Sequence, residues 1–223
     1  MSKVGIHSIE CPECHKTSDV EFWDSVNVDL NPELREKIFN DEIFRFTCPK
    51  CGTIRYIKNG MIYHNMKEKF MLFFDFDKPF ETSGEIEIPA LFNDKGKEYT
   101  FRAVYGLERF KEKILILENG LNDIAVEHMK YMIEHVILPE KFTEGSWCAL
   151  YFIGIAEPDE KFKFGQIVFG IHDSDAECER RISFAMDNYY EHKMACEIDP
   201  RMKPQVNCPC IDQEWMAFNL IKD

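Results

Sequence analysis

Two Cys-X-X-Cys pairs are the residues best suited to chemistry in this 223-residue sequence. Cys11 and Cys14 lie in ECPECHK, Cys48 and Cys51 lie in TCPKCGT, and 33 residues separate the pairs. Such a turn brings two sulfur atoms onto one ion, and four thiolates are a common structural shell for Zn2+. The pattern therefore predicts one structural zinc per chain, with the four cysteines as ligands and no position open for water.

A pair of redox dithiols and a set of unrelated buried cysteines are the alternative interpretations. Redox dithiols lie where a strand ends and a helix opens. Neither pair opens a helical pattern here, and the strand-like residues TIRYI follow the second pair. Two pairs also match the four ligands that zinc prefers, so we favour the metal site.

The residues between the pairs explain their unusual separation, which exceeds the roughly 15–20 residues common in zinc sites. NPELREKIFN, residues 31–40, predicts a short helix with Asn31 as its N-cap and Pro32 at its first position. Leu34 and Ile38 are four apart and would form its apolar face. Strands are predicted within residues 20–30, on both sides of the second pair, and at MIYHN and KFMLFFDF.

The rest of the chain predicts a mixed body of helices and strands. Residues 77–99 are rich in charge and in helix- and strand-breaking residues, with a short strand at EIEI, and provide the domain boundary. A strand at TFRAVYG precedes two helices, one from Leu107 to Leu117 and one from Asp123 to near Pro139. The second helix should bury an apolar face, composed of Ile124, Met129, Met132, Ile133 and Val136.

Further along, WCALYFIGIA and FKFGQIVFGI predict a hairpin. Asp173 or Ser174 would cap a last long helix that ends near His192, and EWMAFNLI would form a terminal strand. The fold class is therefore α+β. A zinc-ribbon-like module with a helical insertion, residues 1–80, is fused to a sheet-and-helix body, residues 81–223.

Composition and charge limit the classes of function. The net charge is −13, of which residues 1–70 contribute −1 (ten basic and eleven acidic residues). The acidic remainder would repel a phosphate backbone, whereas the near-neutral front end would not. We therefore expect a protein partner and disfavour duplex nucleic acid, with local nucleic-acid contact by residues 1–70 as the alternative. An odd cysteine count of nine, no apolar leader and no membrane-length apolar run predict a soluble protein in the reducing cytoplasm.

Other candidate ligands have simpler explanations. Cys208 and Cys210, in NCPCID, are interpreted as incidental thiols, although a Cys-X-Cys motif can also bind metal or form a strained disulfide. The remaining three cysteines are expected to act as small hydrophobic residues: Cys148, Cys178 and Cys196.

The histidines and one acidic segment are weaker candidates still. His128 and His135 are seven residues apart and are expected on a solvated helix face, because they lack the Glu-X-X-His spacing of di-metal helices. His64 would be a fifth ligand for which four cysteines leave no vacancy. HDSD, residues 172–175, is interpreted as a helix cap rather than a cation site.

Residues 9–66 resemble the CpXC domain family, which is named for paired Cys-Pro-X-Cys motifs. The resemblance is carried by IECPECHK, by WDSVNVDLNPELREKIFNDEIFRFTCPKCG and by MIYHNMKEKFML, and it extends to near residue 130. It implies that the two cysteine pairs form one site, and it supplies no reaction. Glycine commonly follows both pairs in the family, whereas His15 follows the first pair here and Gly52 the second.

No nucleophile elbow, phosphate loop, HExxH motif or dinucleotide fingerprint is present in the sequence. We therefore expect a zinc-stabilised binding module rather than an enzyme. The alternative is an enzyme in which the zinc ribbon is a scaffold and the active site, assembled from distant residues, lies in the acidic body.

Overall fold

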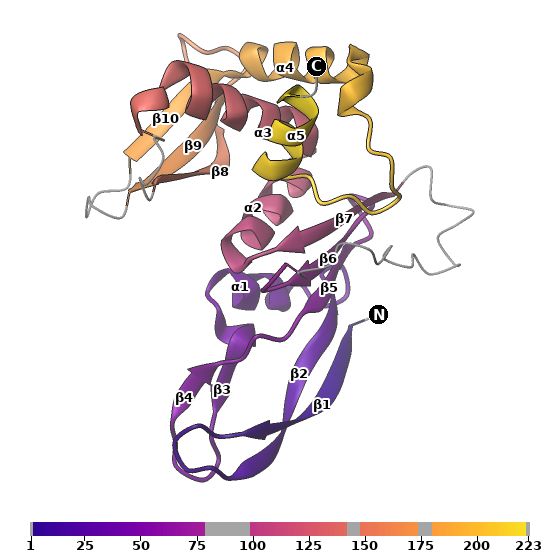
Figure 1. Ribbon diagram of the computed structural model, residues 1–223, viewed down its shortest axis with the longest axis vertical. Coiled ribbons are helices and arrows are strands. Elements are labelled where there is room, and N and C mark those ends of the chain that lie inside the picture. Colours follow the sequence, from indigo (N-terminus) through magenta and orange to yellow (C-terminus); the bar gives the residue numbers. More distant parts are fainter. Residues whose placement is uncertain (1, 79–98, 142–147, 174–179, 222–223) are drawn as a thin grey trace. The chain divides into compact units, whose positions relative to one another are not determined.

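The computed structural model describes residues 2–78, 99–141, 148–173 and 180–221 (Figure 1). The chain divides into two compact units, Met1–Lys111 and Glu112–Asp223, which are described separately below. Both units combine strands with helices, so the predicted α+β class is confirmed at this level.

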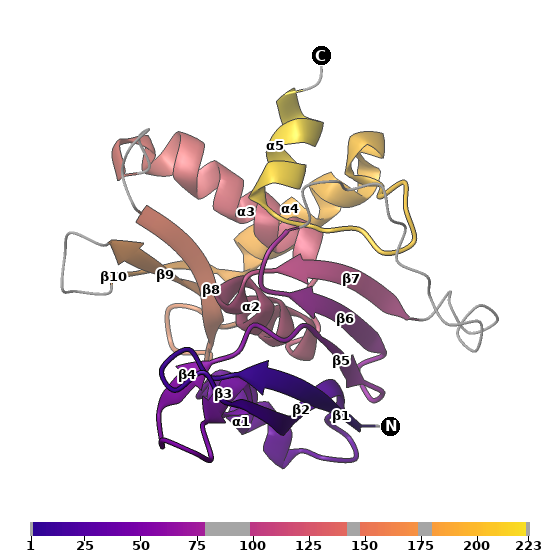
Figure 2. The ribbon, with the colours of Figure 1, turned by 60° about the horizontal axis from the view of Figure 1, so that its bottom comes forward.

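A five-stranded mixed sheet forms the centre of the first unit, in the order β1-β2-β5-β6-β7 (Figure 2). Pairs β1–β2 and β5–β6 are antiparallel, whereas β2–β5 and β6–β7 are parallel. The strands are β1 (Lys3–Glu10), β2 (Thr17–Asn27), β5 (Met61–Asn65), β6 (Phe70–Asp75) and β7 (Thr100–Tyr105). β7 thus belongs to this sheet although it lies beyond residue 80, where sequence analysis ended the first module.

Aromatic side chains fill the core of this sheet. Phe74 stacks on Phe110 with ring centroids 4.2 Å apart, and Tyr63 stacks on Phe70 at 5.9 Å. All four side chains are buried. Phe110 belongs to the first turn of α2 (Leu107–Glu118), so the start of this helix completes the core of the first unit.

The predicted helix between the cysteine pairs is α1 (Glu33–Phe39), followed by the short helix η1 (Glu42–Phe44). Leu34 and Ile38 are buried as expected. The expected cap is wrong in detail, because Pro32 occupies the N-cap position and Asn31 instead donates a hydrogen bond to the Glu33 carboxylate at 3.2 Å.

A small second sheet in the first unit carries the second cysteine pair. It consists of β3 (Arg45–Thr47) and β4 (Ile54–Tyr56), which are antiparallel. The strand–turn–strand predicted here is confirmed. β1, by contrast, was not predicted, because its apolar residues Val4 and Ile6 face solvent with exposed fractions of 39% and 74%.

The second unit contains most of α2 and two further packed helices, α3 (Asp123–Met132) and α4 (Met186–Ile198). α3 continues through the π-helical turn η3 (Ile133–Ile137) to η4 (Pro139–Lys141). Asn122 caps α3, since its side chain accepts hydrogen bonds from two backbone N–H groups of the first turn. The Tyr189 hydroxyl on α4 in turn accepts a 2.8 Å hydrogen bond from the Asn122 N–H.

A three-stranded antiparallel sheet, in the order β10-β9-β8, packs against these helices. Its strands are β8 (Cys148–Ala156), β9 (Gln166–Asp173) and β10 (Arg180–Ala185). The β8–β9 hairpin confirms the prediction. The C-terminal part continues through η5 (Pro200–Met202) to α5 (Gln213–Ile221), whose Met216 is fully buried in a cluster with Ile124 and Cys196.

Three sequence expectations for the second unit are wrong. Residues 180–185 form β10, so the last long helix begins at Met186 instead of near residue 174, and Asp173 ends β9 rather than capping a helix. EWMAFNLI is helical, because it belongs to α5. Val136 is 60% exposed and lies outside the apolar face of α3. The strand expected at residues 85–88 lies outside the described residues, as do Ser174 and Cys178.

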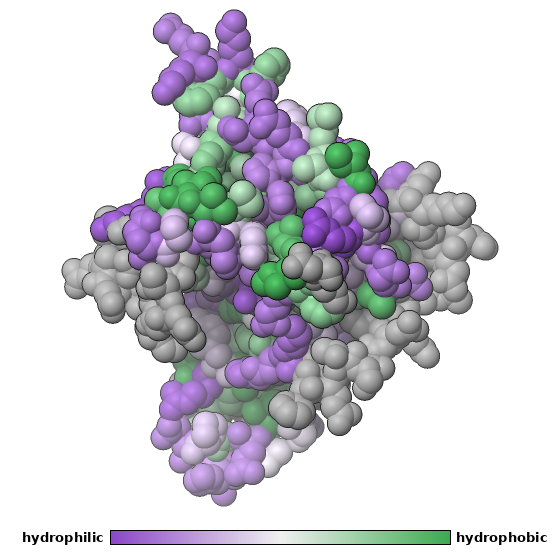
Figure 3. Space-filling model, turned by 45° about the horizontal axis from the view of Figure 1, so that its top comes forward, coloured by the Kyte–Doolittle hydropathy of each residue, from purple (hydrophilic) through white to green (hydrophobic). Residues whose placement is uncertain are grey.

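The surface mixes hydrophilic and hydrophobic residues. On the face shown in Figure 3, hydrophobic side chains gather in separate patches with hydrophilic side chains between them. Among the described helices, none is both long enough and apolar enough to cross a membrane.

Candidate metal centre

The two Cys-X-X-Cys turns lie at the ends of two hairpins of the first unit. The first turn joins β1 to β2, and the second joins β3 to β4 (Figure 1). Neither turn opens a helix, in agreement with the sequence argument against a redox dithiol. The hairpins bring the two turns together although 33 residues separate them in the chain.

All four sulfur atoms of the turns lie within 4.8 Å of one another. The Cys11 and Cys51 sulfurs are 3.7 Å apart, and the Cys14 and Cys48 sulfurs are 3.8 Å apart. Each of these short distances joins one turn to the other. The group could therefore hold a metal ion between the hairpins, as the spacing of the pairs predicted.

Both turns have the same backbone hydrogen bond across their base. The Cys11 N–H donates to the Lys16 carbonyl at 3.0 Å, and the Cys48 N–H donates to the Thr53 carbonyl at 2.9 Å. The two halves of the site are therefore built alike. In the second turn, the Lys50 N–H also donates to the Cys48 sulfur at 3.4 Å.

The residue after each pair adopts the left-handed conformation, with φ of 54° at His15 and 75° at Gly52. Each donates its N–H to the carbonyl of the first cysteine of its pair at 2.9 Å. His15 thus takes the same backbone position as the glycine, and its side chain contacts the Glu10 carboxylate at 3.3 Å. The departure from glycine does not change the form of the turn.

Burial differs among the four cysteines. Cys11 and Cys48 are buried at the base of the site, Cys14 is partly exposed and Cys51 is exposed. The two buried thiols pack with Phe22 and Phe46 in a small hydrophobic cluster. The partly buried side chains of Ile9, Val20 and Ile57 pack against this cluster.

The thiols also differ in acidity. Hydrogen bonds from the side chain and the backbone of Thr53 lower the pKa of the Cys51 thiol to about 6. The Lys16 backbone acts to lower the pKa of Cys14, yet burial and hydrogen bonds with the other three thiols raise it to about 12. Four thiolates this close repel one another, so without a cation the group retains protons.

The other candidates named from the sequence lie outside this group. The His64 imidazole contacts the Asn27 amide and the Tyr99 hydroxyl, each at 3.4 Å. Cys210 donates a hydrogen bond to Asp212 at 3.4 Å, ahead of α5. Among the described residues, the four cysteines of the two turns are the group of three or more metal-ligating side chains that lie together.

Two histidine expectations had different outcomes. His135 is exposed and stacks on Tyr131 with ring centroids 4.1 Å apart, as expected for a solvated position. The expectation for His128 is wrong, because its imidazole is half-buried against His192 of α4. No local signal could identify this contact, since the two residues are 64 apart in the sequence.

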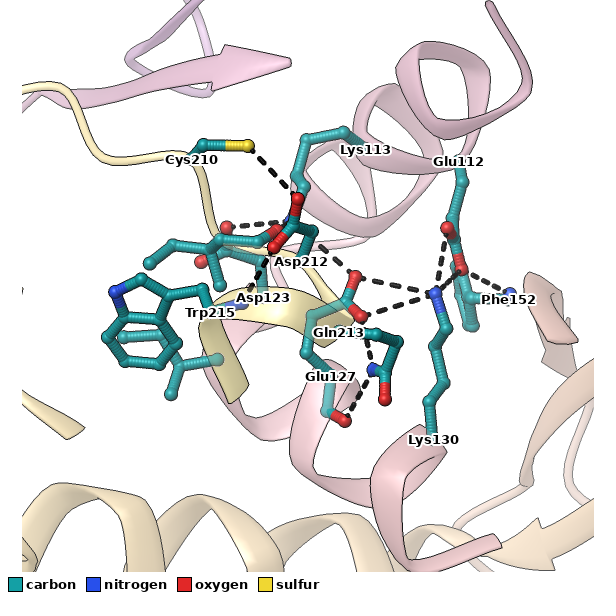
Figure 4. A network of polar contacts seen from close by, with 12 residues as sticks. Glu112, Lys113, Asp123, Glu127, Lys130, Phe152, Cys210, Asp212, Gln213 and Trp215 are labelled. Carbon is teal, nitrogen blue, oxygen red and sulfur yellow. Dashed lines mark hydrogen bonds and ion pairs between the residues drawn. The ribbon is translucent and has the colours of Figure 1, made fainter. Parts of the chain in front are cut away.

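A buried ion network in the second unit was not predicted (Figure 4). Its five charged side chains are all at most 5% exposed: Glu112, Lys113, Asp123, Glu127 and Lys130. Lys130 donates to both oxygens of Glu112, at 2.9 and 3.0 Å, and contacts Glu127 at 3.2 Å. Two lysines and three carboxylates leave this network one negative charge in excess.

Two side chains connect the network to the C-terminal part of the chain (Figure 4). Lys113 reaches the segment just before α5, and Gln213 is the first residue of α5. The Lys113 ammonium donates to Asp123 at 3.0 Å and to the Ile211 carbonyl at 2.7 Å. The Gln213 amide donates to the Glu127 carboxylate at 2.6 Å and to its carbonyl at 2.9 Å. The C-terminal helix is thus anchored by polar contacts as well as by its apolar face.

Burial and nearby charges shift the pKa values of the two glutamates of the network in opposite directions. Burial raises the pKa of Glu112. Burial acts in the same direction on Glu127, but the ammonium groups of Lys130 and Lys113 lower its pKa. A pair of carboxyl groups with opposed shifts is typical of acid–base sites. The carboxyl groups of this pair are at most 4% exposed.

A family model described as CpXC protein matches residues 9–130, more than half of the chain. The match includes all four cysteines of the two turns and extends through α2 to Lys130 of α3. A search of curated proteins and a search of solved structures each found no match.

The first prediction concerns the left-handed residues of the two turns. A Cβ added at Gly52 would meet no atom within 4 Å, so Gly52→Ala acts through backbone strain alone. We expect it to destabilise the first unit by about 1–2 kcal/mol. His15→Gly should change stability less, because relief of strain is offset by the greater entropy of the unfolded chain. Hydrogen exchange of the β3 and β4 amides measures the effect of Gly52→Ala, and exchange of the β1 and β2 amides measures that of His15→Gly. Equal losses of protection in the two hairpins would contradict the explanation.

The second prediction concerns the buried network. Lys130→Met leaves two buried carboxylates without their shared cation, and we expect the second unit to lose about 3–5 kcal/mol of stability. Lys193→Met is the matched control, since Lys193 is 39% exposed and 3.9 Å from Glu197, and it should cost less than about 1 kcal/mol. Urea denaturation measures both variants. A loss for Lys130→Met no larger than that for the control would show that the network contributes little.

Proposed function

The chain belongs to the CpXC family, and we propose that its first unit is a protein-binding module held in its fold by one structural Zn2+. The four cysteines of the two turns are the proposed ligands, Cys11, Cys14, Cys48 and Cys51. The observation that carries the proposal is the spacing of the sulfur atoms between the two hairpins.

That spacing fits a tetrahedral zinc shell. With Zn–S bonds of about 2.3 Å, the sulfur atoms of a regular tetrahedron lie roughly 3.8 Å apart. The two distances between the turns are 3.7 and 3.8 Å. A disulfide would require about 2.05 Å. The arrangement therefore supports an ion at the centre of the four sulfurs.

Charge supports the same assignment. Zn2+ with four thiolates carries a local charge of −2, which nearby cations offset. Lys16 and Lys50 lie in the turns themselves. Arg55 forms an ion pair with Glu13, so it contributes less to this balance than the sequence alone indicates. Thiolate ligands persist in a reducing compartment, and we propose that the protein is located in the cytoplasm.

A complete shell of four cysteines gives the ion a structural role. No position is left for a water molecule, so this zinc would not activate one for hydrolysis. Zinc binding releases on the order of 10 kcal/mol in small zinc modules, comparable with the whole stability of a typical domain. The ion would thus replace the apolar core that this end of the first unit lacks.

The surface near the turns supports a protein partner. Ile54 and Tyr56 on β4 have exposed fractions of 59% and 55%, and Ile6 on β1 has an exposed fraction of 74%. Exposed aliphatic and aromatic side chains suit contact with another protein better than contact with a phosphate backbone. The near-neutral charge of residues 1–70 does not repel a phosphate backbone, so local nucleic-acid contact is the alternative that the fourth prediction tests.

The third prediction tests the zinc. Cys48→Ser removes one of the two buried ligands, so we expect it to release the ion and to unfold the first unit around both hairpins. Elemental analysis should give one zinc per wild-type chain and none in the variant, and limited proteolysis should cleave residues 10–60 only in the variant. A Cys48→Ser protein that keeps one zinc and resists cleavage would refute the assignment, as would iron in the wild-type site.

The matched control is the double variant Cys208→Ser, Cys210→Ser. Both of these cysteines lie in the second unit, and Cys210 is hydrogen-bonded to Asp212. We expect this protein to retain its full zinc content. A substantial loss would show that the ligands lie elsewhere.

The fourth prediction separates a protein partner from duplex DNA. With a net charge of −13, the chain should not shift a DNA duplex at physiological ionic strength. An electrophoretic mobility assay measures this. Submicromolar binding that weakens steeply with added salt would favour a nucleic-acid module instead.

A further inference from the structure

Two histidines from different helices face each other in the second unit. His128 lies on α3 and His192 lies on α4. Their Nδ1 atoms are 2.7 Å apart, and their ring centroids are 4.8 Å apart. Both imidazoles are half-buried. The two helices therefore present the same type of ring nitrogen toward one point.

Two such nitrogen atoms need a positively charged atom between them. Two lone pairs repel at this distance, so either one shared hydrogen or a metal ion must lie between the rings. Burial lowers the pKa of both imidazoles, and this effect outweighs the attraction that Asp199 exerts on protonated His128. Both rings are thus neutral at neutral pH, which is the form that binds metals.

We propose that His128 and His192 form a second metal site, which binds a borderline divalent ion such as Zn2+, Ni2+ or Cu2+ between α3 and α4. Metal–nitrogen bonds of about 2.0–2.1 Å place two ligands roughly 3.3 Å apart in a tetrahedral shell. The site therefore requires the two nitrogens to separate by a few tenths of an ångström, which small rotations of the rings supply.

The remaining positions of this shell belong to water. Cys196 lies one turn beyond His192 on α4, but it is buried against Ile124, and burial raises the pKa of its thiol to about 11. The Asp199 carboxylate is held by Arg201 at 2.8 Å. Because the imidazoles are half-exposed, ions reach the pair from solvent and exchange there.

This site differs from the four cysteines in every relevant property. It has two nitrogen ligands instead of four sulfur ligands, and it has open positions. The affinity of the histidine site for the ion is therefore lower than that of the four cysteines. Its occupancy follows the concentration of free metal. Since the ion would join α3 to α4, binding stabilises the second unit by mass action.

The experiment titrates Ni2+ into the full-length protein whose cysteine site already holds zinc, at about pH 7.5, with calorimetric detection. We expect one nickel ion per chain, and at least tenfold weaker binding in His128→Gln and in His192→Gln. His135→Gln is the matched control, because His135 is an exposed histidine near the end of the same helix, and it should bind like wild type. Cys196→Ser should also bind like wild type.

Two measurements on the wild-type protein complete the test: the pH dependence of nickel binding, and the broadening of histidine resonances by nickel. Lowering the pH stepwise until the imidazoles protonate, below the usual range because burial lowers the pKa of both rings, should weaken nickel binding, with no variant needed. In wild-type protein, paramagnetic Ni2+ should broaden the ring resonances of His128 and His192 first. Wild-type binding no tighter than that of the His128→Gln, His192→Gln double variant would overturn the proposal, as would first broadening elsewhere or loss of binding in Cys196→Ser.

Discussion

The convergence of four thiols from two distant turns is the constraint on which the first unit depends. The turns belong to separate hairpins, and each is closed by the same backbone hydrogen bond. Only a few apolar side chains lie beneath them. Under the zinc proposal, an ion between the turns would add to this small cluster in holding the hairpin ends together. α1 and the large sheet have aromatic and aliphatic cores of their own, so the dependence is confined to the end that carries the cysteines.

The second unit contains a different polar feature, a buried network of charged side chains. Two lysines and three carboxylates are enclosed among α2, α3, β8 and the start of α5. Removing them from water is costly, and their mutual contacts offset this cost only in one arrangement. Such a network favours a single packing of the helices over the many that apolar contacts alone would allow. Both units thus use polar groups to define how their elements meet.

Local signals account for what the sequence predicted. The Leu34–Ile38 spacing and the two strand-like runs of β8 and β9 each lie within a few residues, and each was interpreted correctly. The paired cysteines do lie together, as their spacing predicted. The errors have nonlocal causes. β1 was missed because Val4 and Ile6 face solvent. α5 was taken for a strand because its dense apolar residues suit both structures, and only its burial against the cluster of Ile124 and Cys196 decides.

For the polar groups too, the sequence predicted what depends on local spacing and missed what depends on distant contacts. The four cysteines could be grouped from spacing, the structure brings them together, and the family match covers all four. The ion network could not be found, because Glu112, Lys113 and Lys130 look like ordinary charges on amphipathic helices. Their burial depends on β8 and on residues 211–213, which lie far along the chain. The His128–His192 contact was missed for the same reason.

The anchoring of α5 has a consequence for how the protein is made. Lys113 and Glu127 receive their last partners from Ile211 and Gln213, near the end of the chain. On the ribosome, α2 and α3 emerge long before those residues. Until residues 211–213 have been synthesised, the buried charges of Lys113 and Glu127 lack these hydrogen bonds. The polar network of the second unit is therefore completed only after that late segment has been made, whatever the order in which the helices themselves form.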